Sequence, residues 1–453
     1  MVALAVVIVL LVIGSLIFHF ASPWYFTPLA SNWSTIDFTV DVTFWVCGIV
    51  FVAVNLFTAY CVWRFRARAG NKAHYEPEST KLEVVLTVFT TIGVAAMLTP
   101  GLFVWADFVR VPDDAATVEV VGKQWHWSFR LPGADQELGA SEVRHMNVDN
   151  PLGVDPADSA GQDDIIISSP ILHLPANQPV RMLQRSTDVL HNFTVPQFRV
   201  KMDLVPGMLT YQWFTPTTPG SYEILCEELC GTGHFAMRGK VVVDEPAAYQ
   251  AWLANQPTFA QTQARIVGNA TAGQANYAVC SACHGPQGEG NQQLNAPRLA
   301  GQDVWYLRRQ LLNYQTGVRG TTMGDQFGPQ MVPMAQVVAD PTARENVLAY
   351  IGTLPNNPTP VTVTGGDAEH GRALYFTCST CHGTAGQGRW GTNAPRLAGM
   401  SDWYLERQLQ YFKDGVRGGH PDDIYGDQMN LVANVLVGDN AIKDVVAYIN
   451  SLR

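Results

Sequence analysis

The chain has 453 residues, a formal net charge of −10 and a pI near 5.5. At about 150 residues per domain, this length predicts three or more domains. The acidic balance argues against nucleic acid as a partner, but it leaves room for acidic patches that attract a basic protein. Six of the eight cysteines fall in motifs typical of metal or haem binding, which argues against a disulfide framework.

The first apolar run, residues 2–18, has seventeen residues and is at the short end of what spans a bilayer. No Lys or Arg occurs before Arg64, so the basic region of a signal peptide is missing. We therefore expect residues 1–22 to form a retained membrane helix, with an uncleaved signal-like segment as the alternative.

Two further apolar stretches, residues 38–63 and 82–106, predict a membrane hairpin over residues 36–110. The link between them is basic, whereas residues 19–41 contain no Lys or Arg, so the link is expected in the cytoplasm and the rest of the chain outside it. The basic residues of the link are Arg64, Arg66, Arg68, Lys72 and Lys81.

The remaining two cysteines, Cys47 and Cys61, lie in the first of these stretches. Fourteen residues of helix would separate them by about 21 Å, which is too far for a disulfide. We expect both to be small buried hydrophobic side chains.

From Thr117 the pattern changes to short runs of β-branched and aromatic residues that Gly and Pro interrupt. This pattern predicts an all-β sandwich or barrel over residues 117–245. Within it, residues 134–165 are acidic and rich in Pro and Gly, and we expect them to form a solvated loop.

The segment Cys226–Met237, C-E-E-L-C-G-T-G-H-F-A-M, places two thiols, an imidazole and a thioether on one short loop. Such ligands suit copper and suit hard cations badly. His191 offers a second imidazole thirty-five residues upstream of Cys226. A disulfide between Cys226 and Cys230 is the alternative, but it leaves His234 and Met237 unexplained.

An internal repeat follows a predicted connector over residues 246–266. The sequences C-S-A-C-H-G, N-A-P-R-L-A-G and Y-L-R-R-Q-L recur in register at a shift of 98 residues. The repeat predicts one domain over residues 267–355 and another over 367–453, and the Pro-rich segment 356–366 is an extended linker.

Each repeat contains C-x-x-C-H, the attachment motif for c-type haem, in which both thiols form thioethers and the histidine is an axial ligand. The shift of 98 pairs Met331 with Met429, each forty-seven residues after its histidine, whereas Met323 and Met334 pair with Pro421 and Val432. The predicted haem ligands are Cys280, Cys283, His284 and Met331 in the first domain, and Cys378, Cys381, His382 and Met429 in the second.

The elements D-V-L-H, K-M-D-L-V-P-G and C-x-E-x-C-x-x-x-H-x-x-M resemble subunit II of haem-copper cytochrome c oxidases. The resemblance implies a Greek-key cupredoxin domain with a dinuclear copper centre, CuA. It also implies that Cys226 and Cys230 bridge the coppers and that His191 and His234 cap them. Met237 and the backbone carbonyl of Glu228 would be weak ligands, and the Glu228 carboxylate would bind magnesium at the boundary with subunit I.

The same resemblance assigns roles to two further residues. Trp125, in Q-W-H-W, matches the position that accepts electrons, although an aromatic residue in a strand can equally be part of the core. Glu83 matches a carboxylate at the start of a proton path, although Leu86 and Thr90 stand where the family usually has Trp and Pro. The alternative for Glu83 is a charge at a helix end near the head groups.

The doubled module resembles tandem di-haem bacterial cytochromes c, which implies two all-α class I cytochrome c domains. The whole pattern predicts subunit II of a caa3-like, proton-pumping cytochrome c oxidase in an aerobic respiratory chain. Electrons would pass from a soluble or complex-bound cytochrome c donor through two haems to CuA. The expected partners are subunits I and III and membrane lipid.

The predicted location is the bacterial inner membrane, with several membrane passes and with the copper and haem domains in the periplasm. Oxygen would be reduced on a partner chain, since this chain lacks the membrane histidines of a haem-copper centre. Two alternatives remain: a CuA-containing subunit of a nitric oxide reductase, and a membrane-tethered electron carrier without a fixed catalytic partner.

Overall fold

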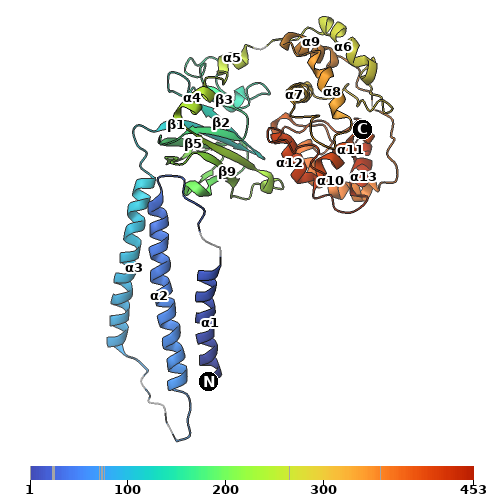
Figure 1. The fold of residues 1–453 in the computed structure, drawn as a ribbon. Helices are drawn as coiled ribbons and strands as arrows, with labels where there is room; N and C mark the ends of the chain where they lie inside the picture. The colour runs from blue at the N-terminus through green and yellow to red at the C-terminus, as the bar shows by residue number, and fades with distance from the viewer. Residues whose placement is uncertain are drawn as a thin grey trace.

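The computed structural model describes residues 2–22, 26–70, 72, 75, 77–264, 266–357 and 359–452. Residues 1, 71, 73, 74, 76, 265, 358 and 453, which the predicted domain and linker ranges include, lie outside this set. Three long helices lead to a β domain, and a pair of helical domains lies beside the β domain (Figure 1). The structure therefore confirms the predicted sequence of helical, all-β and helical regions.

The three N-terminal helices are α1 (Val2–Ala21), α2 (Ser34–Arg64) and α3 (Thr80–Phe108), and each is long and apolar enough to cross a membrane. Large apolar side chains point outward from them, which suits a lipid or protein environment and not water. Cys47 is exposed on α2 and Cys61 is half-buried, so the prediction that both are buried is wrong. The helices cover only part of one another's surface, which leaves such positions open.

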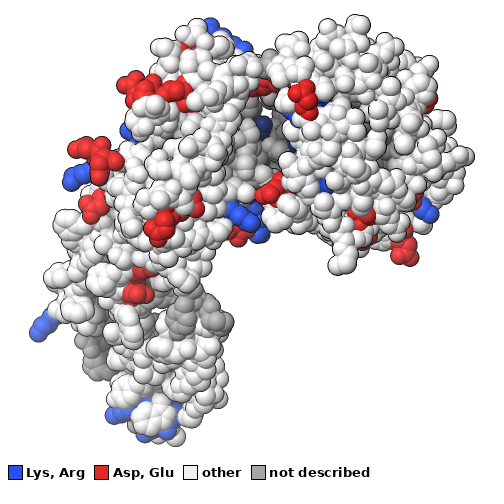
Figure 2. All heavy atoms as spheres, turned by 45° about the horizontal axis from the view of Figure 1, so that its top comes forward, with Lys and Arg blue, Asp and Glu red and all other residues white. Residues whose placement is uncertain are grey.

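Basic residues gather at the end of the helical region that lies away from the β domain (Figure 2). This end carries the link between α2 and α3, whose described basic residues include Arg64, Arg66 and Lys81. Acidic residues are scattered over the visible face of the folded domains. This charge asymmetry is what the positive-inside rule requires if the link is cytoplasmic.

The opposite ends of α2 and α3 are fixed to the β domain by aromatic and ionic contacts. The indole of Trp33 donates a hydrogen bond to the Trp213 carbonyl at 3.0 Å, and the indole of Trp213 donates to the Asp107 carbonyl at 3.1 Å. Arg199 pairs with Asp37 at 2.6 Å. These contacts hold the β domain against the ends of α2 and α3.

The β domain consists of two five-stranded sheets, in the orders β3-β2-β1-β5-β8 and β4-β10-β9-β6-β7. The pairs β1/β5 and β4/β10 are parallel and the others antiparallel. The strands are β1 (Ala116–Lys123), β2 (His126–Leu131), β3 (Ile165–Ile167), β4 (Ile171–Pro175), β5 (Val180–Ser186), β6 (His191–Val195), β7 (Val200–Leu204), β8 (Thr210–Phe214), β9 (Gly220–Cys226) and β10 (Arg238–Asp244).

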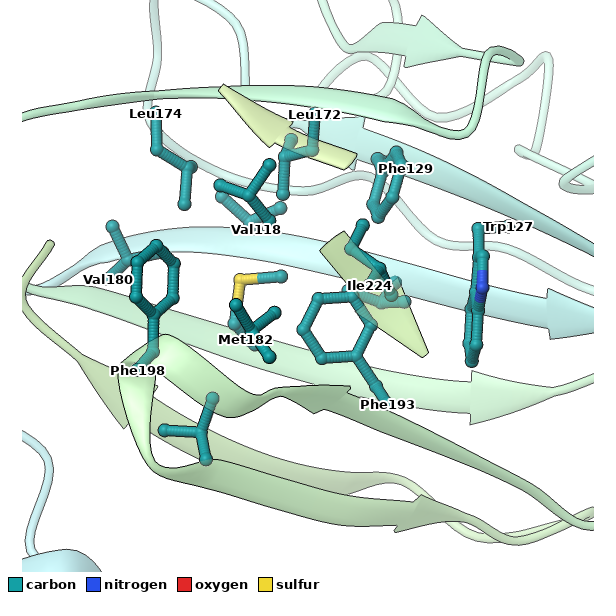
Figure 3. Packing of buried hydrophobic residues seen from close by; sticks show 14 of the residues in the cluster. Val118, Trp127, Phe129, Leu172, Leu174, Val180, Met182, Phe193, Phe198 and Ile224 are labelled. Carbon is teal, nitrogen blue, oxygen red and sulfur yellow. The ribbon is translucent and has the colours of Figure 1, made fainter. Parts of the chain in front are cut away.

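The core of this sandwich lies between the two sheets (Figure 3). Alternating strand residues point inward, as their period of two requires. Trp127, Phe129, Phe193 and Phe198 are all fully buried there. Burial of several large aromatic side chains gives the small domain a rigid interior.

We expected the acidic segment 134–165 to be a solvated loop, but part of it is buried. Leu152 and Val154 are buried, and so is Asp164 at its end. The guanidinium of Arg130 in β2 binds Asp164 at 2.9 Å, Glu119 in β1 at 2.8 Å and the Gly139 carbonyl at 2.7 Å. A buried arginine therefore attaches the segment to the sheet.

The predicted connector contains two helices, α4 (Pro246–Leu253) and α5 (Phe259–Gln263), which pack on the β domain. Trp252 stacks on His173 of β4 with ring centroids 4.5 Å apart. Phe259 is fully buried, and its backbone N–H donates to the Asp164 carbonyl. Most of this interval is thus part of the β domain surface.

The two helical domains repeat the same four-helix arrangement. In each domain, a glycine of the first helix allows it to cross the last helix closely. A Cβ at Gly273 or Gly371 would clash with the backbone carbonyl of Asn346 or Asp444. The helices are α6 (Ala270–His284), α7 (Val304–Gln315), α8 (Gly328–Gln336) and α9 (Pro341–Ile351), then α10 (Ala368–His382), α11 (Asp402–Lys413), α12 (Ile424–Ala433) and α13 (Ala441–Ser451).

The two repeats contact each other through the same residues in both directions. Arg319 donates to the Tyr404 hydroxyl at 2.6 Å, and Arg417 donates to the Tyr306 hydroxyl at 2.8 Å. These two contacts are related by the shift of 98 residues. A contact that recurs with the partners exchanged is the signature of a two-fold interface, here within one chain.

Candidate metal and haem sites

The segment 226–237, the copper loop, connects β9 to β10. Cys226 ends β9 and lies opposite Phe193 of β6, and His191 is two residues from Phe193 on the same strand. Because alternate strand residues share a face, this register brings His191 to Cys226. Met237 ends the loop directly before β10.

The predicted copper ligands converge around Cys230. Its Sγ lies 3.7 Å from Cys226 Sγ, 3.5 Å from His234 Nδ1 and 3.9 Å from Met237 Sδ. The backbone carbonyl oxygen of Glu228 lies 3.3 Å from Cys226 Sγ. A sulfur separation of 3.7 Å is far longer than the about 2.05 Å of a disulfide, and both cysteines are free thiols here.

His191 is fully buried and completes the set. Its Nε2 lies 2.8 Å from the Asp188 carboxylate, whereas its Nδ1 is buried with no hydrogen-bond partner among the described residues. The ligand atoms of His191, Cys226 and Cys230 all lie within 4.8 Å of one another. A carboxylate that holds one ring nitrogen and leaves the other free is the usual support for a metal-binding histidine.

The electrostatics of the loop also suit a metal. The hydrogen bond between the two thiols lowers the pKa of Cys226 to about 3 and raises the pKa of Cys230. Burial lowers the pKa of His191, but the hydrogen bond to the Asp188 carboxylate and the neighbouring Cys226 sulfur outweigh it, so the net shift is upward. A soft cation would displace the remaining thiol protons when it binds.

Trp125 lies directly against the copper loop. Its indole N–H donates to the Cys230 carbonyl at 3.0 Å, and the residue is only 6% exposed. His126 is buried with its ring 5.1 Å from that of Tyr425, and Trp127 belongs to the core. The contact between Trp125 and Cys230 was not foreseen from the sequence, because it joins segments 105 residues apart.

Gly233 allows the loop to pack on the Trp125 ring, since an added Cβ would lie 2.5 Å from a ring carbon. We expect Gly233→Ala to destabilise the loop by about 1–3 kcal/mol, because neither the ring nor the loop has room to move. Gly391→Ala is the control, because nothing lies within 4 Å of a Cβ there. The temperature at which each variant loses its copper absorption would measure the effect. Equal midpoints for the two variants would contradict this packing.

Each C-x-x-C-H motif ends the first helix of its repeat. His284 Nδ1 lies 2.7 Å from the Pro297 carbonyl, and His382 Nδ1 lies 2.7 Å from the Pro395 carbonyl. Burial lowers the pKa of both histidines, so each is neutral, with Nδ1–H as donor and Nε2 free for a metal. The repeated P-R-L-A-G motif thus supplies the carbonyl that orients each histidine. In both repeats its proline follows the histidine by thirteen residues, and this spacing was the sequence signal for the role.

A single cavity of about 330 Å³ connects the two motifs and reaches the copper loop. Met331 and Met429 both line it, together with the motif cysteines and histidines. Met323 is 95% exposed and does not line it, whereas Met334 does. The lining is mainly apolar, which suits porphyrins, and the axial roles of Met331 and Met429 remain predictions.

Glu83 and the Glu228 carboxylate lie apart from this cavity. Glu83 is exposed in the first turn of α3, at the end that lies away from the β domain. Glu228 is half-buried on the copper loop. The structure therefore brings together the predicted copper ligands and the haem motifs. Neither the Glu83 carboxylate nor the Glu228 carboxylate lines the cavity between them.

Comparison with known proteins agrees with this organisation. Residues 116–245 match the family described as cytochrome c oxidase subunit II, periplasmic domain, and residues 270–355 and 368–453 both match cytochrome c. The first family implies CuA, and the second implies haem c.

Two relatives illustrate the match, and one solved structure aligns with part of the chain. The alternative cytochrome c oxidase subunit 2 of Bradyrhizobium diazoefficiens is 54% identical over 263 residues, which cover 58% of this chain and 95% of that protein. Cytochrome c oxidase subunit 2 of Cereibacter sphaeroides is 29% identical over 237 residues, covering 50% and 77%. The structure of cytochrome c4 from Pseudomonas stutzeri aligns with a TM-score of 0.33 and 29% identity, covering 41% and 100%. The chain belongs to the cytochrome c oxidase subunit II family and carries two cytochrome c domains after its copper domain.

Proposed function

We propose that this chain is subunit II of a caa3-type, proton-pumping cytochrome c oxidase, with two covalent haems where such subunits usually carry one. The observation that carries the proposal is the shared cavity, which connects two haem motifs and a soft-metal loop in one protein. Oxygen would be reduced to water at the haem-copper centre of subunit I.

CuA would be held by His191, Cys226, Cys230, His234, Met237 and the carbonyl of Glu228. The haems would be held by Cys280, Cys283, His284 and Met331, and by Cys378, Cys381, His382 and Met429. Bound there, these groups supply one-electron redox centres, and His/Met ligation raises the haem potential relative to His/His. The resemblance to the oxidase family supports these roles, as do the distances around Cys230.

The protein's own residues would orient these groups and exclude water from them. Asp188 fixes the His191 ring, and the carbonyls of Pro297 and Pro395 fix the two haem histidines. Burial lowers the pKa of His284 and His382, which favours the neutral imidazole that a metal needs. Such fixed ligands favour rapid electron transfer, because little has to rearrange when charge moves.

The proposed setting is the bacterial inner membrane, with α1, α2 and α3 as spans and the folded domains in the periplasm. Contacts with subunits I and III and with lipid would cover the exposed apolar side chains of these helices. Glu83 would lie at the cytoplasmic start of a proton path, which its position at the basic end of the hairpin supports. Glu228 would bind magnesium near subunit I.

Gas consumption by the purified complex tests the function. We expect the complex to take up oxygen with a reduced cytochrome c as donor, to release protons on the periplasmic side and not to consume nitric oxide. Nitric oxide consumption without oxygen uptake would identify a nitric oxide reductase subunit. Release of the chain alone by mild detergent would instead indicate a tethered carrier, and either result would overturn the proposal.

A further inference from the structure

The two cytochrome domains share their sequence pattern but meet the copper loop differently. Thr380, between the haem cysteines of the second motif, lies with its hydroxyl 3.2 Å from that of Thr232 in the loop. Gln428, next to Met429, donates to the Trp125 carbonyl at 2.8 Å. Helix α12 also contacts the loop's short helix His234–Ala236, and in Figure 1 it lies on the side that faces the β domain.

The haem cysteines show the same asymmetry. Cys381 packs against the hydrophobic core that includes Cys226 and Cys230, whereas its equivalent in the first domain, Cys283, is exposed. Helices α6 and α9 of the first domain lie at the top of the helical pair, above the second domain (Figure 1). The attachment segment of the second domain is thus the one placed against the copper loop.

From this asymmetry we propose that the second cytochrome domain is the immediate electron donor to the copper loop, and that electrons enter the chain at the first domain. The inference rests on the proposed electron-relay function. The haem that Cys378, Cys381 and His382 would hold would pass one electron to the copper pair and change from iron(II) to iron(III). The first haem would return one electron to the second, and an external one-electron carrier would re-reduce the first.

Trp125 takes on a different role in this arrangement. The second domain packs against Trp125 and leaves no room for another protein there. Trp125 is only 6% exposed, and its carbonyl accepts a hydrogen bond from Gln428. An external donor therefore cannot use this face. The tethered domain occupies the position from which Trp125 would otherwise receive electrons.

Magnetic relaxation of the oxidised copper centre tests the order, because a nearby paramagnetic haem iron accelerates it. In the complete complex, Cys378→Ala/Cys381→Ala would remove the second haem, and Cys280→Ala/Cys283→Ala is the matched removal of the first. We expect relaxation to slow several-fold in the former and to change little in the latter. A larger effect from removal of the first haem, or equal effects from the two removals, would overturn the proposal. Absence of copper or covalent haem from the unaltered chain would instead refute the relay function.

A second pair of variants keeps both haems. Thr380→Ala reproduces the C-S-A-C-H sequence of the first motif, so haem attachment should survive in Thr380→Ala/Gln428→Ala. Loss of two ordinary hydrogen bonds shifts the docked equilibrium on the order of tenfold. We expect hydrogen exchange of copper-loop amides to rise accordingly in the full chain, and to stay unchanged in the matched variant Gln330→Ala. An unchanged loop, or an equal rise in both, would count against docking by the second domain.

Discussion

Cys230→Ser is expected to remove the copper centre and stop reduction of the partner's haems, while both c-type haems of this chain still reduce. Cys230 is the hub of the site, within 4 Å of Cys226, His234 and Met237. A serine hydroxyl is a hard donor with a high pKa and cannot replace a thiolate as a ligand for soft metals. The loss should exceed the roughly 10–100-fold that removal of an outer-shell partner costs.

Stopped-flow absorption of the purified complex would measure both steps, because haems of different type absorb at different wavelengths. Cys61→Ser is the matched control, since that thiol lies in α2, outside the cluster. It should leave both steps unchanged. Rapid downstream reduction in the Cys230→Ser complex would show that electrons bypass the copper loop.

Arg130→Leu is expected to destabilise the β domain by about 3–5 kcal/mol, because it leaves buried carboxylates without their shared cation. Arg130 and Glu119 are only 3% and 4% exposed, and Asp164 is fully buried. Glu119 keeps Arg185 as a partner at 2.8 Å, whereas among the described residues the Asp164 carboxylate keeps only the backbone N–H of Gly139. The thermal midpoint for loss of the copper absorption should fall by roughly 10 °C or more.

The cost of Arg130→Leu should also depend on pH. Burial raises the pKa of Asp164 to about 6 although Arg130 opposes the shift, so the folded protein binds this proton more tightly than the unfolded chain. Removing Arg130 raises the folded pKa further, and protonation then relieves the unpaired charge. The destabilisation should therefore be smaller at pH 5 than at pH 8. Arg144→Leu, at an exposed ion pair, should cost less than about 1 kcal/mol at either pH.

Local spacing explains why the sequence predicted so much of the site. Cys226, Cys230, His234 and Met237 lie on one loop of twelve residues, so any fold that closes the loop brings them together. The shift of 98 residues likewise predicted two equivalent helical domains. These predictions needed only short-range order and a repeat.

Other features depend on tertiary packing that no local pattern contains. The hydrogen bond from Trp125 to the Cys230 carbonyl joins distant segments, as does the clamp of Arg130 on the segment 134–165. The composition of that segment indicated solvent, but Arg130 and Arg185 of the sheet both bind it. The asymmetry between Cys283 and Cys381 could not follow from the repeat either, because the two motifs are nearly identical.

Metal and haem stoichiometry, combined with electron paramagnetic resonance, tests the central claim most directly. The account predicts two copper ions and two covalent haems per chain, with a copper hyperfine pattern from one unpaired electron shared equally by both ions. A copper-free chain, or a signal from a single isolated copper ion, would contradict it.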